Sequence, residues 1–217
     1  ELKGMAAAHL SLPALDEADI YRHLDLDWVS PELREDTGEI AAATQKALPR
    51  LIIPSDIRGA LHNHTTLSDG DASLEQMADA ARNIGWNWLG IADHSQSLKI
   101  ANGASAEDLL AQGVVIKQYN SAWADEGVDF RLFHGVESDI IEDGKLDYPD
   151  EVLAKLDYVV ASVHAMTKWK NRDEVTNTEE LIRVIDHPAT SVLGHPTGRI
   201  LQGRDGYEVD MFAVIEH

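Results

Sequence analysis

The chain has 217 residues, no cysteine, and a formal net charge of −20 at pH 7. Its length suits one domain, or one domain with an appendage, and a hydrophobic content of 44% is sufficient for a buried core. The absence of cysteine excludes disulfides and thiolate metal sites, and it fits a reducing cytoplasm, where we expect the protein to act. The 38 acidic residues against 18 basic ones argue against a surface that binds nucleic acid throughout.

Residues 1–55 differ in pattern from the rest of the chain. We expect a helix around Leu15–Leu24 and a short helix over Gly38–Leu48, and prolines between and after them favour extended connections. No apolar pattern in this segment indicates a core of its own. The segment is therefore predicted to be a connector that packs on the domain of residues 56–217. No apolar run approaches the ~20 residues of a membrane span, and we expect no membrane partner.

From Arg58 onward, strand-like runs alternate with helix-like runs. The strand candidates are Gly59–His64, Trp88–Asp93, Phe130–Glu137, Tyr158–His164 and Ser191–His195. The helix candidates are Ser73–Ile84, Ala106–Ala124, Pro149–Leu156 and Thr178–Asp186. Ser73 and Gln76 also have the spacing of a helix-capping box. Alternation of this kind predicts an α/β fold around a parallel sheet, either open or closed into a barrel.

Potential metal ligands stand at the end of every predicted strand. In chain order they are His62, His64 and Asp69, then Asp93 and His94, then Glu137 and Asp139, then His164, and finally His195. The carboxyl ends of parallel strands form the functional face of such folds. A lone histidine is more often a packing residue, but five strand ends that all supply histidine or carboxylate predict a metal site. The other histidines are interpreted as surface or packing residues: His9, His23, His134, His187 and His217.

The type of ligand restricts the metal. Imidazole and carboxylate without sulfur suit zinc, manganese or iron better than magnesium or calcium. Neighbouring cations that share a carboxylate would clamp a phosphate and activate water near neutral pH. Lys99, Arg199 and Arg204 lie in loops beyond strand ends, and are candidates to contact a substrate phosphate. Solvated surface charge is the alternative for each of them.

Five motifs resemble the PHP (polymerase and histidinol phosphatase) family: LHNHTTLSDG, IADHS, GVESDI, ASVH and LGHPTGR. The segments PELREDTGEI, DIRGALHNHTT, DHSQSLKIANGAS and DYPDEV are most similar to the C-terminal PHP domain of bacterial family X DNA polymerases. This resemblance covers roughly residue 30 to the end of the chain. It implies a distorted (β/α)7 barrel that holds up to three divalent metal ions.

The resemblance also implies a role for each ligand candidate. His62 and His64 would hold the first metal, His164 and His195 the second, Asp69 and His94 the third, and Glu137 would bridge the first two. The catalytic residues would be His62, His64, Glu137, His164 and His195.

A late Asp-x-His motif of the family does not occur before the chain ends at His217, and about five of the seven strands are visible. We therefore expect a C-terminally incomplete barrel in a fragment of a longer protein. On this interpretation, residues 1–55 are the remnant of an upstream polymerase region.

The resemblance implies metal-dependent hydrolysis of a phosphoester in DNA as the leading function. The expected forms are 3′–5′ exonuclease action or 3′-end processing in DNA repair, with polymerase domains upstream in the same polypeptide. The alternative is a small-molecule phosphatase of the histidinol-phosphatase type, which the acidic balance favours. A third alternative is a non-catalytic module that braces a polymerase, although the retained ligands argue against it.

Overall fold

The structure is a computed structural model that describes residues 16–200 and 202–217. The chain divides after Pro54 into two compact units, which are described separately. Within the described ranges, no helix combines the length and the apolar character that crossing a membrane requires.

The first unit contains two short α-helices, α2 (Glu17–His23) and α3 (Glu39–Thr44), and the 3-10 turn η1 (Pro31–Leu33). Its small core is formed by the buried Tyr21, Val29 and Ala43, with Leu26, Leu33 and Leu48 packed against them. The expectation that this segment lacks a core is therefore wrong. The apolar residues come from separate short elements, so they show no periodic run in the sequence.

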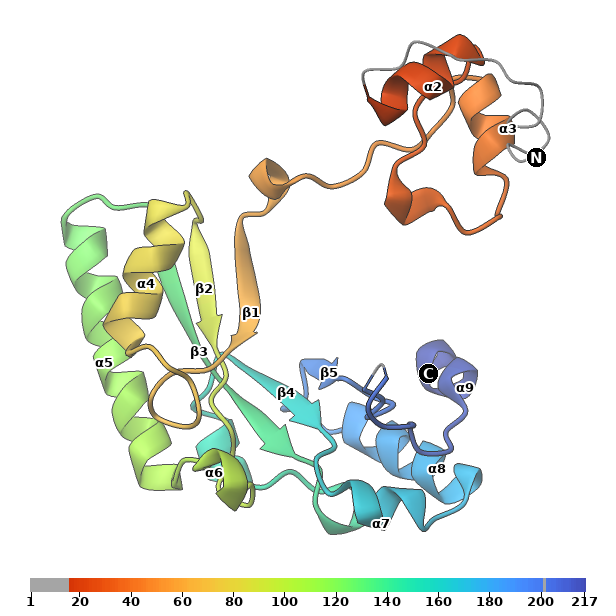
Figure 1. Ribbon diagram of the computed structural model, residues 1–217. Helices are drawn as coiled ribbons and strands as arrows, with labels where there is room; N and C mark the ends of the chain where they lie inside the picture. Colours follow the sequence, from red (N-terminus) through yellow and green to blue (C-terminus); the bar gives the residue numbers. More distant parts are fainter. Residues whose placement is uncertain (1–15, 201) are drawn as a thin grey trace. The chain divides into compact units, whose positions relative to one another are not determined.

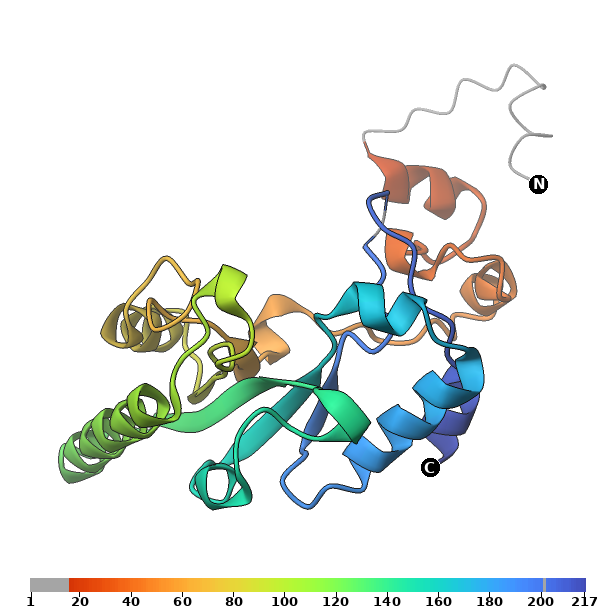
Figure 2. The same ribbon diagram turned by 90° about the horizontal axis from the view of Figure 1, so that it is seen from below.

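The second unit is built on five parallel strands that pair in sequence order and form a curled sheet (Figures 1 and 2). They are β1 (Gly59–Asn63), β2 (Trp88–Ile91), β3 (Arg131–Asp139), β4 (Tyr158–Ser162) and β5 (Val192–Gly194). The prediction of an α/β fold around a parallel sheet is confirmed. Four of the strands end one or two residues before their predicted ends, whereas β3 continues two residues further. His64, His94, His164 and His195 therefore lie just after their strands.

Helices connect the strands, and a last helix follows β5. They are α4 (Leu74–Asn83), α5 (Ala106–Asp125), α6 (Asp150–Leu153), α7 (Met166–Lys170), α8 (Glu174–Ile185) and α9 (Met211–Glu216). The 3-10 turns are η2 (Pro54–Asp56), η3 (Lys99–Ala101) and η4 (Glu142–Gly144). Ser73 and Gln76 form the predicted capping box of α4. The helix α8 begins four residues before its predicted start, because the Asp173 side chain accepts a hydrogen bond from Thr176 N and caps it there.

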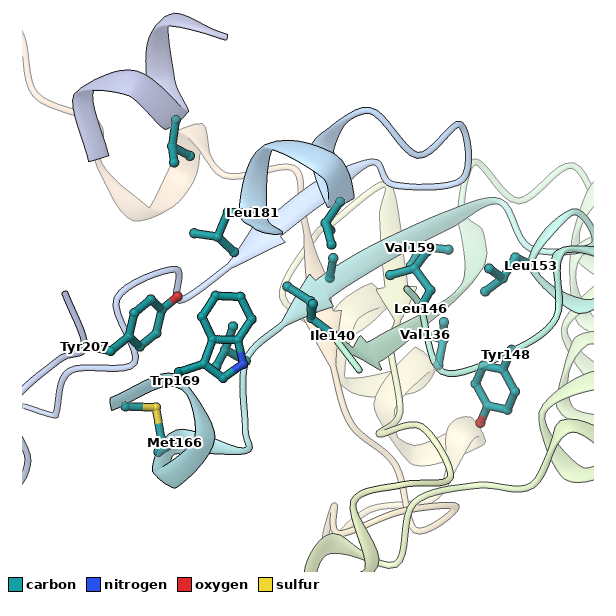
Figure 3. Close-up of a cluster of buried hydrophobic side chains, with 14 of the residues drawn as sticks. Val136, Ile140, Leu146, Tyr148, Leu153, Val159, Met166, Trp169, Leu181 and Tyr207 are labelled. Atoms are coloured by element: carbon teal, nitrogen blue, oxygen red, sulfur yellow. The ribbon is translucent and has the colours of Figure 1, made fainter. Parts of the chain in front are cut away.

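The core lies between the sheet and the helices. Leu89, Ile91 and Leu132 pack against α4 and α5. Val136, Val159 and Ala161 belong to the larger cluster that includes α6, α7, α8 and α9 (Figure 3). These residues alternate along their strands with those of the opposite face, as the two-residue period of a strand requires. The helices thus cover one face of the sheet.

On the opposite face of the sheet, the Tyr158 side chain lies directly against the backbone of β2 and β3. A Cβ atom on Gly135 would lie 2.4 Å from the ring of Tyr158, and one on Gly90 would lie 2.6 Å from its hydroxyl. Tyr158 thus crosses two neighbouring strands at positions that only glycine allows. Ser162 follows on the same face of β4, and the site begins just beyond it.

Candidate metal centre

Glu137 is the centre of the site. It lies on β3 and is only 1% exposed. Its backbone is fixed on both sides by the chain that follows β2: Glu137 N donates to Asp93 O at 3.0 Å, and Ser95 N donates to Glu137 O at 3.0 Å. The carboxylate therefore has a defined position between the ends of β2 and β4.

Five imidazoles surround this carboxylate. The nitrogen to oxygen distances to Glu137 are 3.1 Å from His62, 3.7 Å from His64, 2.8 Å from His94, 3.4 Å from His164 and 2.9 Å from His195. All five histidines that the sequence assigned to the site thus reach one buried group. They come from four different strand ends.

The arrangement fits metal ligands better than a hydrogen-bond network. Three imidazole nitrogens, from His62, His164 and His195, approach the same oxygen of Glu137, which has only two lone pairs. His94 Nδ1 is buried and 2.8 Å from the other oxygen, yet it lacks hydrogen-bond alignment. Ligand atoms that share one cation at ~2.0–2.2 Å lie about 3 to 3.5 Å apart, which is the spacing seen here.

Asp69 extends the cluster on the side of β1. Its oxygens lie 3.7 Å from His64 Nδ1 and 3.6 Å from His94 Nε2. Three overlapping triads could each hold one ion, with ligand atoms within 4.8 Å of one another in every triad. They are His62, His64 and Glu137; His64, Asp69 and His94; and His94, Glu137 and His164. Shared members make this a candidate multinuclear site.

Two of the site histidines have a positive φ angle, which residues other than glycine rarely adopt. The φ angle is +63° at His62 and +26° at His195. His62 lies in an irregularity of β1, where the pairing register shifts between Ala60 and Asn63. The imidazoles of His62 and His64 nevertheless lie close together, with their centroids 5.3 Å apart. The simple alternation of a strand does not explain it, because the bulge intervenes.

Asp139 orients His164. The Nδ1–H of His164 donates to the Asp139 carboxylate, so that Nε2 is left to face Glu137. Asp139 is held in turn by the hydroxyl of Ser97 at 2.7 Å, and its backbone N donates to Ser95 Oγ at 2.9 Å. A carboxylate behind a ligating histidine is a common feature of metal sites. The sequence placed Asp139 among the strand-end carboxylates but gave it no role, although its spacing of two from Glu137 was the available signal.

The electrostatics of the cluster favour a cation. Burial alone would raise the pKa of Glu137, but the neighbouring imidazoles of His164, His195, His62 and His94 hold its pKa well below the usual range. Burial alone would lower the pKa of His164, but Asp139 and Glu137 raise it to about 9. Burial lowers the pKa of His64, with a further contribution from His94. The centre thus combines an ionised carboxylate with imidazoles of opposite tendency, because the neutral form is favoured at His64 and the charged form at His164.

Asp93, the other strand-end carboxylate, does not face the cluster. It is fully buried and accepts hydrogen bonds from Thr65 N at 2.6 Å and Thr65 Oγ1 at 2.8 Å. Ser68 Oγ and Gln112 Nε2 each donate to it at 2.7 Å. Asp93 therefore ties the loop after β1, which carries Asp69, to β2 and α5. The sequence gave no signal for Gln112, which lies on a helix far along the chain.

The candidate phosphate-binding residues are not in direct contact with the cluster around Glu137. Lys99 and Arg199 are exposed, and among the described residues neither side chain forms a hydrogen bond or ion pair with the cluster. Arg199 and Arg204 border a hollow of about 420 Å³ in the loop after β5. Arg204 also donates to Gly198 O at 3.1 Å, which gives it a structural contact.

The other histidines that the structure describes lie outside the cluster around Glu137. His134 is buried against Gly113 of α5, where a Cβ atom would lie 2.5 Å from its ring. His187 and His217 pair with Asp150 and Asp186 at 3.4 and 2.9 Å. His9 falls outside the described residues.

Comparison with known proteins identifies a family for the chain. Residues 60–213 match the family model described as the PHP domain. The DNA polymerase/3′-5′ exonuclease PolX of Bacillus subtilis is 39% identical over 200 residues, which are 92% of this chain and 34% of that protein. A probable phosphatase of Caldicellulosiruptor saccharolyticus is 30% identical over 158 residues, covering 71% of this chain and 59% of that protein. A probable phosphatase of Caldanaerobacter subterraneus is 37% identical over 92 residues, covering 42% of this chain and 33% of that protein.

The chain therefore spans about a third of the length of PolX and between a third and three fifths of these two phosphatases. The family match covers most of the chain, and it includes every histidine that surrounds Glu137. This chain belongs to the PHP domain family.

Proposed function

We propose that the chain is a metal-dependent phosphoester hydrolase. The observation that carries this proposal is the buried Glu137 carboxylate, which five imidazoles approach within 2.8–3.7 Å. Such a donor set suits two or more divalent cations that share a carboxylate. Cations of this kind polarise a phosphoryl oxygen and make water nucleophilic near neutral pH.

The residues of the chain hold and orient this centre. Glu137 Oε1 faces His62, His164 and His195, whereas Oε2 faces His64 and His94, so this carboxylate would be the bridging ligand. The Asp139 carboxylate holds a proton on His164 Nδ1, so Nε2 would be the atom that binds a cation. His195 is the most open of the five histidines, with a side chain that is 45% exposed, so a substrate phosphate would approach beside it.

We assign the ligands as the resemblance implies, with His62 and His64 on the first metal, His164 and His195 on the second, and Asp69 and His94 on the third. The triad of His64, Asp69 and His94 supports the last assignment. Nitrogen and oxygen donors without sulfur favour zinc, manganese or iron. If His164→Ala and His195→Ala each leave metal content unchanged, the assignment of the second position is wrong.

The proposed substrate is DNA, with the 3′ end as the point of attack. This rests on the likeness to the B. subtilis polymerase and 3′-5′ exonuclease, which extends over nearly the whole chain. In this proposal, polymerase domains of the same polypeptide deliver the strand in the cytoplasm. The net charge of −20 makes DNA binding by this part alone weak.

The direct test is hydrolysis with Mn²⁺ of a 3′-labelled oligonucleotide, compared with histidinol phosphate. We expect shortening or trimming of the 3′ end to be the faster reaction. Glu137→Gln should lower both rates by about a thousandfold or more, because the amide cannot bridge two cations. The exposed Glu126→Gln is the matched control and should leave both rates unchanged.

A small-molecule phosphatase is the second candidate, and the similarity to several probable phosphatases favours it. The two candidates differ in what they need beyond the metal centre. Fast turnover of histidinol phosphate without DNA processing would decide for the small-molecule phosphatase. Loss of neither reaction in Glu137→Gln would contradict both.

A further inference from the structure

The rim of the metal centre carries charge unevenly. The loop after β1 (residues 64–73) has two aspartates and no basic residue. The segment after β4 (residues 163–173) has three basic residues, Lys168, Lys170 and Arg172, and a single acidic one. Such a local excess of positive charge stands out in a chain with a net charge of −20.

Helix α7 presents two of these basic residues from a fixed base. Met166 and Trp169 are 7% and 0% exposed and anchor the helix, and Figure 3 shows both beside Tyr207. Lys170 is exposed, and the side chain of Lys168 is 32% exposed. The two lysines thus lie on a helix that Met166 and Trp169 hold in place.

The three basic residues of α7 and its end differ in their partners. Arg172 pairs with the buried Glu180 and lies over the Trp169 ring, so its charge is used within the fold. Lys168 Nζ is 3.9 Å from Glu142, whose side chain is 88% exposed. An exposed pair of this length contributes at most about 1 kcal/mol, so a phosphate can replace the carboxylate.

The loop after β5 adds a third cation to the same side of the site. Gly198 packs so closely on α7 that a Cβ atom there would lie 2.3 Å from Met166 Sδ. The exposed Arg199 follows immediately, which places it beside α7. We call Lys168, Lys170 and Arg199 the basic rim.

The basic rim is connected directly to two site histidines. Met166 N donates to His164 O at 2.7 Å, and Gly198 N donates to His195 O at 2.9 Å. Lys168 and Arg199 each follow one of these histidines by four residues, a reach of at most about 14 Å even for an extended chain. The rim therefore lies within a few nucleotide lengths of the metal centre.

We propose that the basic rim holds the sugar–phosphate backbone of single-stranded DNA while its 3′ end occupies the metal centre. This deepens the proposed function and depends on it. A phosphomonoester has a single phosphate, which the metal centre itself would bind, and cations on two further elements add little for it. A strand has additional phosphates, and flexible lysines bind them without regard to base.

The test uses the full chain, with Lys168→Glu/Lys170→Glu as the rim variant. The control variant is Lys117→Glu/Lys155→Glu, which changes the net charge equally at exposed lysines on α5 and after α6. Binding of a fluorescent single-stranded oligonucleotide is measured by anisotropy, in chelator, over a range of NaCl concentrations. Turnover with Mn²⁺ is measured in parallel on the oligonucleotide and on p-nitrophenyl phosphate.

We expect the rim variant to bind DNA at least about tenfold more weakly than the control variant. The slope of log K against log [NaCl] should fall by about 1.4, since each lost phosphate contact on a single strand removes ~0.7. On DNA, the rim variant should have a higher KM and an almost unchanged kcat. Its loss of kcat/KM on DNA should exceed its loss on p-nitrophenyl phosphate by about fivefold or more.

Equal DNA affinities of the two variants would overturn the proposal, as would no binding by the unaltered chain up to about 100 µM DNA. The proposed function fails in a different way: the unaltered chain would then bind DNA through the rim but hydrolyse none of it. Equal losses on DNA and on p-nitrophenyl phosphate would show that α7 supports the metal centre only.

Discussion

An imidazole can bind a cation only in its neutral form, and burial favours this form at two histidines of the protein. His64 in the metal centre and His134 beneath α5 share this property, since burial lowers the pKa of both. His134 is the simpler case, because it lies outside the site and its Nε2 is buried with no hydrogen-bond partner. Its charge state therefore affects folding rather than catalysis.

This leads to a pH dependence of stability. The pKa of His134 is lowered in the folded protein, so the unfolded chain takes up the proton first as pH falls. The free energy of unfolding should decrease below about pH 6.5, by at most about 1.4 kcal/mol per pH unit for this one residue. Urea unfolding at pH 7.5 and 5.5 would measure it. The pH dependence should be smaller in His134→Gln, and an equal dependence in both proteins would refute the assignment.

His62 allows a second test on a single residue. Its φ of +63° is a conformation that glycine adopts freely, whereas other residues pay about 1 kcal/mol or more. His62→Gly should therefore be more stable than His62→Ala by about 1 kcal/mol, although both lose the ligand. The matched pair at His64, whose φ is not positive, should show the opposite order. Thermal unfolding in chelator measures both pairs.

The loop after β1 depends on one buried carboxylate. Asp93 accepts hydrogen bonds from Thr65, Ser68 and Gln112, and removing it would leave these donors unsatisfied. Asp93→Ala should lower the free energy of unfolding by about 3 kcal/mol or more. Asp71→Ala, an exposed carboxylate of the same loop, is the control and should change it by less than about 0.5 kcal/mol. Comparable losses in the two variants would contradict the role of Asp93.

Elements that the sequence predicted well are those with a strong local pattern. The strands and α5 combine apolar runs with clear end signals, and the candidate ligands lie near the carboxyl ends of the strands or just beyond them. Helix α7 was not predicted, because its five residues contain three polar ones and its anchors, Met166 and Trp169, are explained only by Gly198 and Tyr207 far along the chain. The bulge at His62 was missed for a similar reason, since it depends on pairing with β2.

The charge of the whole chain should affect its stability. A net charge of −20 opposes compaction through self-repulsion, and salt screens this repulsion. The melting temperature in chelator should rise between about 20 and 200 mM NaCl, where the screening length falls from ~20 to below 10 Å. Differential scanning calorimetry would measure the change. A melting temperature that falls over this range would show that specific ion pairs outweigh the repulsion.

The central claim is that Glu137 and the surrounding imidazoles bind a cluster of cations. Anomalous diffraction from crystals grown with Mn²⁺ or Zn²⁺ tests it most directly, because it places each ion independently of activity. We predict at least two peaks about 2.0–2.2 Å from the ligand nitrogens and oxygens, with Glu137 shared between two of them. Crystals that show no peak beside Glu137, while its carboxylate only accepts hydrogen bonds from the histidines, would contradict the account.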